Sequence, residues 1–408
     1  MKKNALSILI LSSGLVLSAC NNGGSGGNSY ESPSNTDLNT IANPVVGTPI
    51  AYTKTDFSAV AADSVVMTYK MKGVKGTEVQ ATSLVFTPKT APPASGWPIV
   101  VWAHGTTGVA DVCAPSRNET NADIKKMISK FLAEGYVVVA PDYEGLGEPS
   151  GTELHPFLNV KSEGYSITDA VVATRNWLGN KASKQWVTVG HSQGGQAALG
   201  AAQYADRANL DYKGTVAVAP ASQLNLILNA GESSVANATP VQQIPVYASL
   251  DTFTALIAAG LRNANPTLDY SQVFKVPTDA IAKQAESVCS SQLGDKFGGA
   301  MGQYVAINGS LKNYPRKTDT FMSLPAVKTF LEKDSQPLQV QVKTPIIIYQ
   351  GGADTTVPKA ATDTLYGTAK ALATKVHYIT EPTWDHGKAY SENIDNIVAD
   401  VKGMFAAQ

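Results

Sequence analysis

Four short, uninterrupted apolar runs constrain the fold of this chain more than any other feature of its sequence. They cover residues 98–103, 135–140, 186–189 and 215–218. Strands that are apolar throughout are typical of parallel sheets, which are buried on both faces. Helical segments are predicted between these runs at residues 122–134, 165–178 and 192–207. This alternation predicts an α/β fold with a doubly wound, mostly parallel sheet and flanking helices.

Elements outside this series extend the predicted sheet. Residues 65–70 and 79–86 alternate as two antiparallel strands, and a seventh apolar run and a last helix are expected at 345–350 and 393–405. The core therefore comprises residues 49–222 and 343–408. Residues 223–342, mainly helical, are predicted to be inserted between strands 6 and 7. We interpret them as a cap over the carboxyl ends of the strands, although a plain second lobe would give the same pattern.

The N-terminus has the features of a bacterial export signal. Two lysines precede an apolar segment that closes on Leu17-Ser18-Ala19-Cys20, which resembles the lipobox of lipoproteins. Residues 1–19 are therefore interpreted as a signal peptide and Cys20 as a lipidated residue. Residues 20–48, rich in Gly, Ser and Asn, are expected to be a flexible linker. The expected location is a bacterial membrane, most simply the outer membrane, with ordinary secretion as the alternative.

Composition excludes several classes of partner. A net charge of −1 argues against nucleic acid, whose binders are strongly basic. After Cys20 only Cys113 and Cys289 remain, and an isolated pair in an oxidising compartment predicts a disulfide. No histidine, cysteine or carboxylate spacing suggests a metal, and the dinucleotide fingerprint is absent, so neither a metal nor a cofactor is expected.

A candidate nucleophile lies where an apolar strand meets an alanine-rich helix. Residues 190–194 read GHSQG, with Ser192 between Gly190 and Gly194. A sharp strand-to-helix turn exposes its central side chain and requires small neighbours two positions away. The alternative is an ordinary junction with glycines for packing. The pattern favours a nucleophile elbow with Ser192 as the attacking residue.

A serine nucleophile needs a general base, and imidazole is the group best suited to this near neutral pH. The chain has five histidines. Four fit the role poorly. His191 adjoins the nucleophile and His104 begins a glycine loop. His377 lies in an apolar run, where burial in the core is expected, and His155 lies in a loop that follows no strand. His386 follows the last predicted strand by a short loop, where the base of such a fold is expected.

The base in turn needs a carboxylate to orient its ring. Asp354 follows the seventh strand directly, although an aspartate there could also be a turn former. Asp385 competes, but its adjacency to His386 gives poor geometry for a hydrogen bond to the ring. The order serine, aspartate, histidine along the chain favours a triad of Ser192, Asp354 and His386.

Attack on a carbonyl also requires two hydrogen-bond donors for the oxyanion. The residue after the nucleophile provides the first, so the backbone N–H of Gln193 is expected in this role. The loop HGTTG at 104–108 follows the third strand and is the candidate for the second. Thr106 is the expected donor, with Thr107 as the alternative.

The chain resembles the α/β-hydrolase superfamily, and more narrowly the secretory lipase family that includes fungal lipase A-type enzymes. The narrower resemblance rests on DVCAPS at 111–116, on APDYEGLG at 140–147 and on the long cap. It implies cofactor-free hydrolysis of carboxylic esters, often acylglycerols. It also implies that Cys113, in the first motif, is bridged to Cys289 in the cap.

Together these features predict an extracytoplasmic serine hydrolase that cleaves carboxylic esters of small molecules or lipids through an acyl-enzyme. Membrane contact is expected only through the N-terminal lipid. A peptidase or an acyltransferase could use the same triad, because the nucleophile does not select the leaving group. A surface lipoprotein that binds ligands without catalysis is the remaining alternative.

Overall fold

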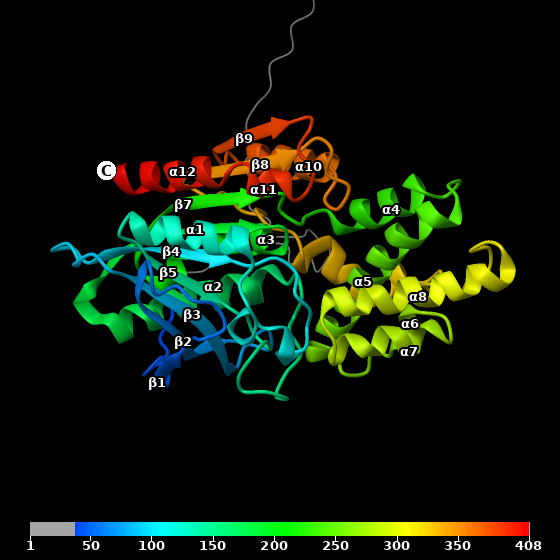
Figure 1. Ribbon diagram of the computed structural model, residues 1–408, viewed down its shortest axis with the longest axis horizontal. Coiled ribbons are helices and arrows are strands. Elements are labelled where there is room, and N and C mark those ends of the chain that lie inside the picture. The colour runs from blue at the N-terminus through cyan, green and yellow to red at the C-terminus, as the bar shows by residue number, and fades with distance from the viewer. Residues whose placement is uncertain (1–36, 408) are drawn as a thin grey trace, which may run out of the picture. The chain divides into compact units, whose positions relative to one another are not determined.

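The sheet of the protein has nine strands, of which the last six in spatial order are parallel. A computed structural model describes residues 37–407, which belong to one unit of the chain, residues 32–408 (Figure 1). The spatial order of the strands is β1-β2-β3-β5-β4-β6-β7-β8-β9. Their bounds are Val45–Ala51, Ala61–Lys72, Glu78–Pro88, Trp97–Ala103, Val137–Pro141, Ala182–His191, Asp211–Val218, Ile346–Gly351 and Val376–Glu381 for β1 to β9. The pairs β1–β2, β2–β3 and β3–β5 are antiparallel. The predicted α/β fold with a mostly parallel sheet is confirmed.

Helices cover both faces of this sheet. Buried side chains of α2 (Val160–Leu178), α3 (Gln193–Gln203) and α10 (Lys359–Ala371) share one apolar cluster with the strands. Those of α1 (Ala122–Ala133) and α12 (Ile394–Ala406) share another with the opposite face. Strands apolar on both faces therefore have apolar partners on both faces, which explains the continuous runs in the sequence.

The long segment between β7 and β8 supplies most of a further apolar cluster, to which Val109, Phe157, Leu158 and Ala221 also contribute. It contains six α-helices, α4 to α9, with the bounds Leu224–Ser234, Pro240–Ala264, Tyr270–Val273, Thr278–Ala282, Ser290–Asn308 and Pro325–Thr329. In Figure 1 the arrowheads of β7, β8 and β9 point toward it. The helix α5 is long and apolar enough to cross a membrane, but 61% of its apolar window is buried in the protein, as in the core helix of a soluble domain.

Two local features differ from the sequence-based expectations. The strand β1 begins at Val45, inside the segment interpreted as a linker, because Val45 and Ile50 pair with Tyr69 and Val66 of β2. His377, expected to be buried in its apolar run, is exposed on β9. This strand is the edge of the sheet, and none of its residues is buried, unlike most residues of the inner strands.

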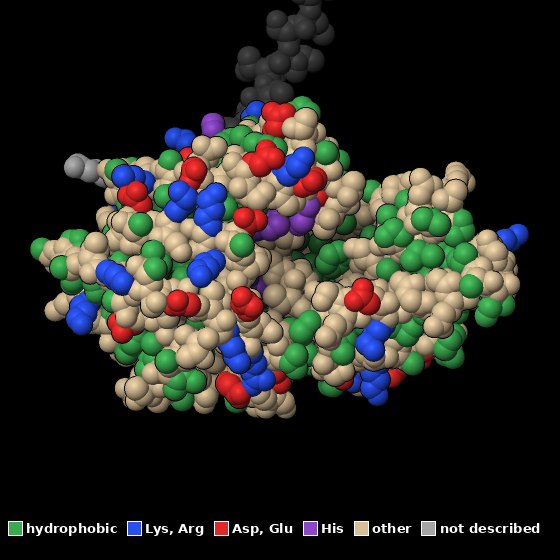
Figure 2. Space-filling view, in the orientation of Figure 1, with side chains coloured by type: hydrophobic (Ala, Val, Ile, Leu, Met, Phe, Trp, Pro, Cys, Tyr) green, Lys and Arg blue, Asp and Glu red, His purple; other side chains and the backbone are tan. Residues whose placement is uncertain are grey.

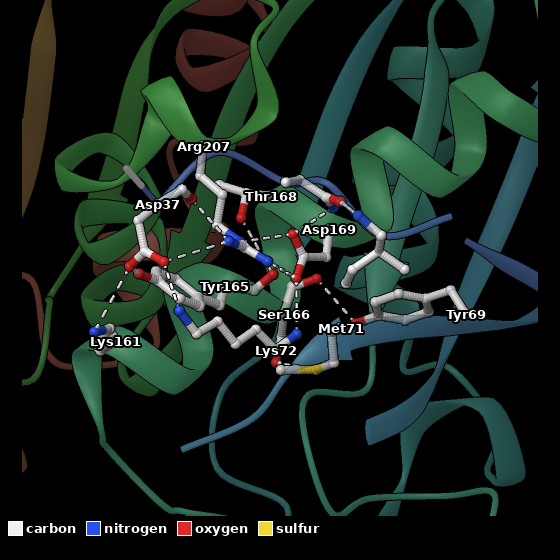
Figure 3. Close-up of polar contacts among 12 residues, drawn as sticks. Asp37, Tyr69, Met71, Lys72, Lys161, Tyr165, Ser166, Thr168, Asp169 and Arg207 are labelled. Carbon is white, nitrogen blue, oxygen red and sulfur yellow. Dashed lines mark hydrogen bonds and ion pairs between the residues drawn. The ribbon is translucent and has the colours of Figure 1, made fainter. Parts of the chain in front are cut away.

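A buried ion pair secures the start of the described chain. Arg207 donates from Nε and Nη2 to the two carboxylate oxygens of Asp169, at 2.8 and 2.9 Å, and from Nη1 to the carbonyl oxygen of Asp37 at 2.8 Å. Figure 3 shows its guanidinium between the two aspartates, and it stacks 4.4 Å from the ring centre of Tyr165. The Asp37 carboxylate accepts from Lys72 Nζ at 2.6 Å. These contacts join the start of the described chain to β2, to α2 and to the segment that follows α3.

We expect the Arg207→Met variant to lose about 3–5 kcal/mol of its free energy of unfolding, because removing one partner leaves the buried Asp169 carboxylate uncompensated. Urea denaturation followed by circular dichroism measures this loss. Lys161→Met is the matched control. Its ammonium lies 3.8 Å from Asp37 and is largely exposed, so its removal should change stability by less than about 0.5 kcal/mol. Equal losses of unfolding free energy in the two variants would contradict a stabilising role for the buried pair of Arg207 and Asp169.

Candidate active site

Ser192 occupies a strained turn between β6 and α3. Its backbone has φ 61° and ψ −120°, outside the regions that L-residues usually adopt. A Cβ on Gly190 would lie 2.0 Å from the carbonyl oxygen of Gly194, and a Cβ on Gly194 would lie 1.9 Å from that of Ala103. Both positions therefore require glycine. The geometry is that of a nucleophile elbow, which keeps the hydroxyl clear of the surrounding backbone.

The side chains of Asp354 and His386 are joined by a hydrogen bond of 2.7 Å between Oδ2 and Nδ1. Asp354 follows β8, and its other oxygen accepts from the backbone N–H groups of Thr356 and Val357 at 2.9 and 2.8 Å. A carboxylate only accepts, so Nδ1 of His386 carries the hydrogen and Nε2 keeps its lone pair. An imidazole held in this tautomer can accept a proton at Nε2.

His386 lies beside the elbow. The ring of His191, the residue before Ser192, is 4.6 Å from that of His386, and its Nε2 donates to the His386 carbonyl oxygen at 2.9 Å. Burial lowers the pKa of His191, and the nearby charge of His386 lowers this pKa further, to about 3. The ring of His191 therefore stays neutral. Within residues 37–407 the Ser192 hydroxyl makes no hydrogen bond to His386, and such contacts often tighten only when substrate is bound.

Two sets of backbone N–H groups lie near Ser192. Gln193 is the first residue of α3, so its N–H has no partner within the helix. The loop after β4 approaches from the other side, where a Cβ on Gly105 would lie 3.8 Å from that of Ser192. Thr107, the alternative donor, is held to the inserted segment by its carbonyl oxygen, which accepts from Ser290 N–H at 2.9 Å. Thr106 lies between Gly105 and Thr107, and all three residues are partly exposed.

The predicted disulfide joins this loop region to the inserted segment. Cys113 and Cys289 are bonded, with their Cα atoms 5.4 Å apart, and Cys289 immediately precedes α8. The sulfur of Cys113 also packs closely on Gly108, because a Cβ on this glycine would lie only 2.8 Å from it. The bond therefore holds the start of α8 against the end of the 104–108 loop.

A groove begins at Thr106 and runs between α5 and α8. Its volume is about 650 Å³, and apart from Thr106 the walls come from these two helices. Ile244, Ala248 and Phe253 form one side, and small residues such as Gly298 form the other. Figure 2 shows histidine side chains at the edge of a hollow whose far side carries many apolar side chains. The groove thus begins at the loop that approaches Ser192 and presents apolar side chains along α5.

Several buried polar residues behind the elbow were not identified from the sequence. Tyr143, His155 and Glu163 are fully buried. His155 and Glu163 also contact the side chain of Gln193, the residue after Ser192. A buried histidine in a proline-containing loop has no sequence pattern that marks it. Residues 37–407 contain no group of three or more His, Cys, Asp or Glu side chains that could hold a metal.

Comparison with known proteins agrees with this fold. Lipase A of Candida antarctica in its closed state superposes with a TM-score of 0.68 at 18% identity, over 91% of this chain and 84% of that one. The rice cell wall degrading esterase LipA of Xanthomonas oryzae gives 0.62 at 17%, over 88% and 97%. No curated protein matches the chain by sequence. The architecture is that of the α/β-hydrolases.

The family model for secretory lipases matches residues 116–398. The chain belongs to the secretory lipase family and is a carboxylic ester hydrolase, which confirms the family and the enzyme class expected from the sequence. Its substrates are small-molecule esters. Family membership and the disulfide also indicate an exported protein.

Proposed function

We propose that Ser192, His386 and Asp354 are the catalytic triad of this ester hydrolase. The observation that carries the proposal is the hydrogen bond between His386 and Asp354 beside a strained serine turn. The backbone N–H groups of Gln193 and Thr106 are the proposed oxyanion donors. Thr107 fits less well as a donor. Its carbonyl oxygen accepts from the N–H of Ser290, and this hydrogen bond holds the residue toward the start of α8.

In the proposed reaction, Nε2 of His386 takes the hydroxyl proton of Ser192 as Oγ attacks the ester carbonyl carbon. The carbonyl π electrons move to the oxygen, where the two N–H donors stabilise the charge. As the tetrahedral intermediate collapses, the alcohol leaves with the proton from His386. Water, deprotonated by His386, then attacks the acyl carbon of the acyl-enzyme. As this second intermediate collapses, the bond to Ser192 Oγ breaks, Oγ takes the proton back from His386, and the carboxylic acid is released.

The groove between α5 and α8 is the proposed site of the acyl chain. It starts at Thr106, so an acyl group on Ser192 Oγ can enter it, and its apolar walls suit a short-to-medium chain or one chain of an acylglycerol. Residues 223–342 then act as the cap that shapes substrate selectivity.

The location of the enzyme forms the last part of the proposal. Exported and anchored by a diacylglyceryl group on Cys20, the enzyme would work at a bacterial membrane, with residues 20–48 as its tether. The proposed signal peptide, Cys20 and most of this tether lie outside the described residues. Incorporation of radiolabelled palmitate by the expressing cells, lost in Cys20→Ser, tests the anchor.

A fluorophosphonate probe tests the triad. The Ser192 oxygen displaces fluoride and forms a P–O bond, so mass spectrometry should find the adduct on the peptide containing Ser192. Esters from acetate to palmitate, measured beside aminoacyl anilides, define the reaction. Faster turnover of anilides would identify a peptidase instead, and an adduct on another serine would overturn the assignment.

We expect Gly298→Leu to shorten the acyl chains that the enzyme accepts. A Cβ at this position meets only Ala248 and Ile244, both at 3.8 Å, so the helix tolerates the change while the side chain fills the groove. The ratio of kcat/KM for octanoate to that for acetate should fall by about 10-fold or more.

Gly302→Leu is the matched control for this substitution. It lies on the same helix, no atom is within 4 Å of its Cβ position, and it does not line the groove. Its octanoate-to-acetate ratio should stay within about twofold of the wild-type value. An unchanged ratio in Gly298→Leu would place the acyl chain elsewhere.

A further inference from the structure

The side chain of Gln193 is anchored in a buried polar cluster behind the elbow. Its Nε2 lies 2.7 Å from Oε1 of Glu163, near the start of α2, and 2.8 Å from Nε2 of His155. Oε1 of Glu163 also accepts from the backbone N–H of Leu158 at 3.0 Å. His155 and Glu163 are completely buried, and Gln193 is 1% exposed.

The hydrogens in this cluster can be assigned from its acceptors. His155 Nδ1 faces the carbonyl oxygen of Glu144 at 2.9 Å, and a carbonyl only accepts, so Nδ1 is the donor. His155 Nε2 faces the amide nitrogen of Gln193, which only donates, so Nε2 is the acceptor. Both amide hydrogens of Gln193 are therefore used, one toward His155 and one toward Glu163. This arrangement fixes the first residue of α3 in two directions.

His155 is also connected, through the ring of Tyr143, to the loop on the other side of Ser192. The ring of Tyr143 stacks between those of His155 and His104, with ring centres 5.6 and 4.3 Å away. Its hydroxyl donates to the carbonyl oxygen of His104 at 3.0 Å. Tyr143 has φ 77°, so the backbone is held in an unfavourable conformation that directs the ring into this stack.

We propose that Glu163, His155 and Tyr143 form a buried scaffold that positions the two oxyanion donors, Gln193 N–H and Thr106 N–H, relative to each other. The inference rests on the proposed function, because it assigns these residues to the oxyanion site of that triad. They are positioning residues: none reaches the groove, and each acts through Gln193 or through the loop that begins at His104.

The physical need for such a scaffold follows from the local backbone. The donor N–H groups belong to two separate segments, a strained turn and a glycine loop, and neither segment alone fixes the distance between them. Misplacing a catalytic group by about 1 Å can cost about 100-fold in rate. Side chains locked by buried hydrogen bonds supply that precision.

The test compares Gln193→Met with Tyr143→Phe. The first keeps the backbone donor and the side-chain volume but loses both hydrogen bonds; the second keeps the ring and loses the bond to His104. With p-nitrophenyl butyrate, kcat should fall by about 10- to 100-fold in Gln193→Met and by a smaller factor in Tyr143→Phe, with KM within about threefold. The inhibition constant of a trifluoromethyl ketone, whose serine adduct carries the oxyanion, should rise by the same factor as kcat falls.

Gln196→Met is the matched control, because Gln196 is a buried glutamine one turn along α3 that donates to the carbonyl oxygens of Leu158 and Ser335. Its kcat and inhibition constant should stay within about threefold of wild type. A folded Gln193→Met enzyme with wild-type kcat, or one in which only KM rises, overturns the scaffold. Such a result leaves the triad intact, whereas failure of the fluorophosphonate to label Ser192 in the wild-type enzyme overturns the proposed function itself.

Discussion

The Ser192→Ala variant is expected to lose ester hydrolysis by about 10⁶-fold in kcat while keeping its fold. The nucleophilic oxygen is absent, so no acyl-enzyme can form, and only substrate binding and the oxyanion donors remain. Alanine tolerates φ 61° no worse than serine does, so stability should hardly change. Purified variant and wild type should be compared on p-nitrophenyl butyrate under single-turnover conditions, with thermal unfolding measured in parallel.

A second serine near the elbow provides the control. Ser222 is fully buried, and its hydroxyl has no hydrogen-bond partner within residues 37–407. It follows Ala221, whose N–H donates to the carbonyl oxygen of Ser192 at 3.1 Å. Ser222→Ala should retain kcat within about threefold. If Ser192→Ala remained active while Ser222→Ala did not, a different hydroxyl would have to be the nucleophile.

The parts of this site that follow from local sequence were predictable. A strand-to-helix turn with glycines at 190 and 194 limits the backbone to one geometry, and the structure shows the contacts of about 2 Å that any side chain there would make. Asp354 and His386 could be selected because parallel strands end at the same edge of a sheet, so loops that follow β8 and β9 lie close together. Their hydrogen bond is a direct result of that topology.

Residues whose role depends on packing were not predictable in this way. His155 lies in a loop without periodicity, and only the folded chain reveals that Tyr143 and Gln193 approach it from two different elements. Burial of His377 was inferred from its apolar neighbours, but the edge position of β9 exposes it. Apolar periodicity describes one strand at a time, whereas the position of that strand in the sheet determines which faces are covered.

The Asp354→Asn variant is expected to lose about 10⁴-fold in kcat, with KM little changed. Two backbone N–H groups point at Oδ1 of this residue, so the asparagine oxygen must occupy that position and its amide nitrogen must face His386. Nδ1 of His386 then becomes an acceptor and the ring hydrogen moves to Nε2. A base that already carries a hydrogen on Nε2 cannot take the proton of Ser192.

Asp385 separates this tautomer effect from a general loss of negative charge near the ring. It directly precedes His386 in the chain, yet its Oδ1 accepts from the backbone N–H of Lys388 at 2.8 Å, the first residue of α11 (Lys388–Ser391). Asp385→Asn removes the same charge and should keep kcat within about threefold. Equal losses in the two variants would mean that charge alone supports the base. A loss confined to Asp354→Asn would require the directed hydrogen bond, because only that bond determines which nitrogen of His386 is free to accept a proton.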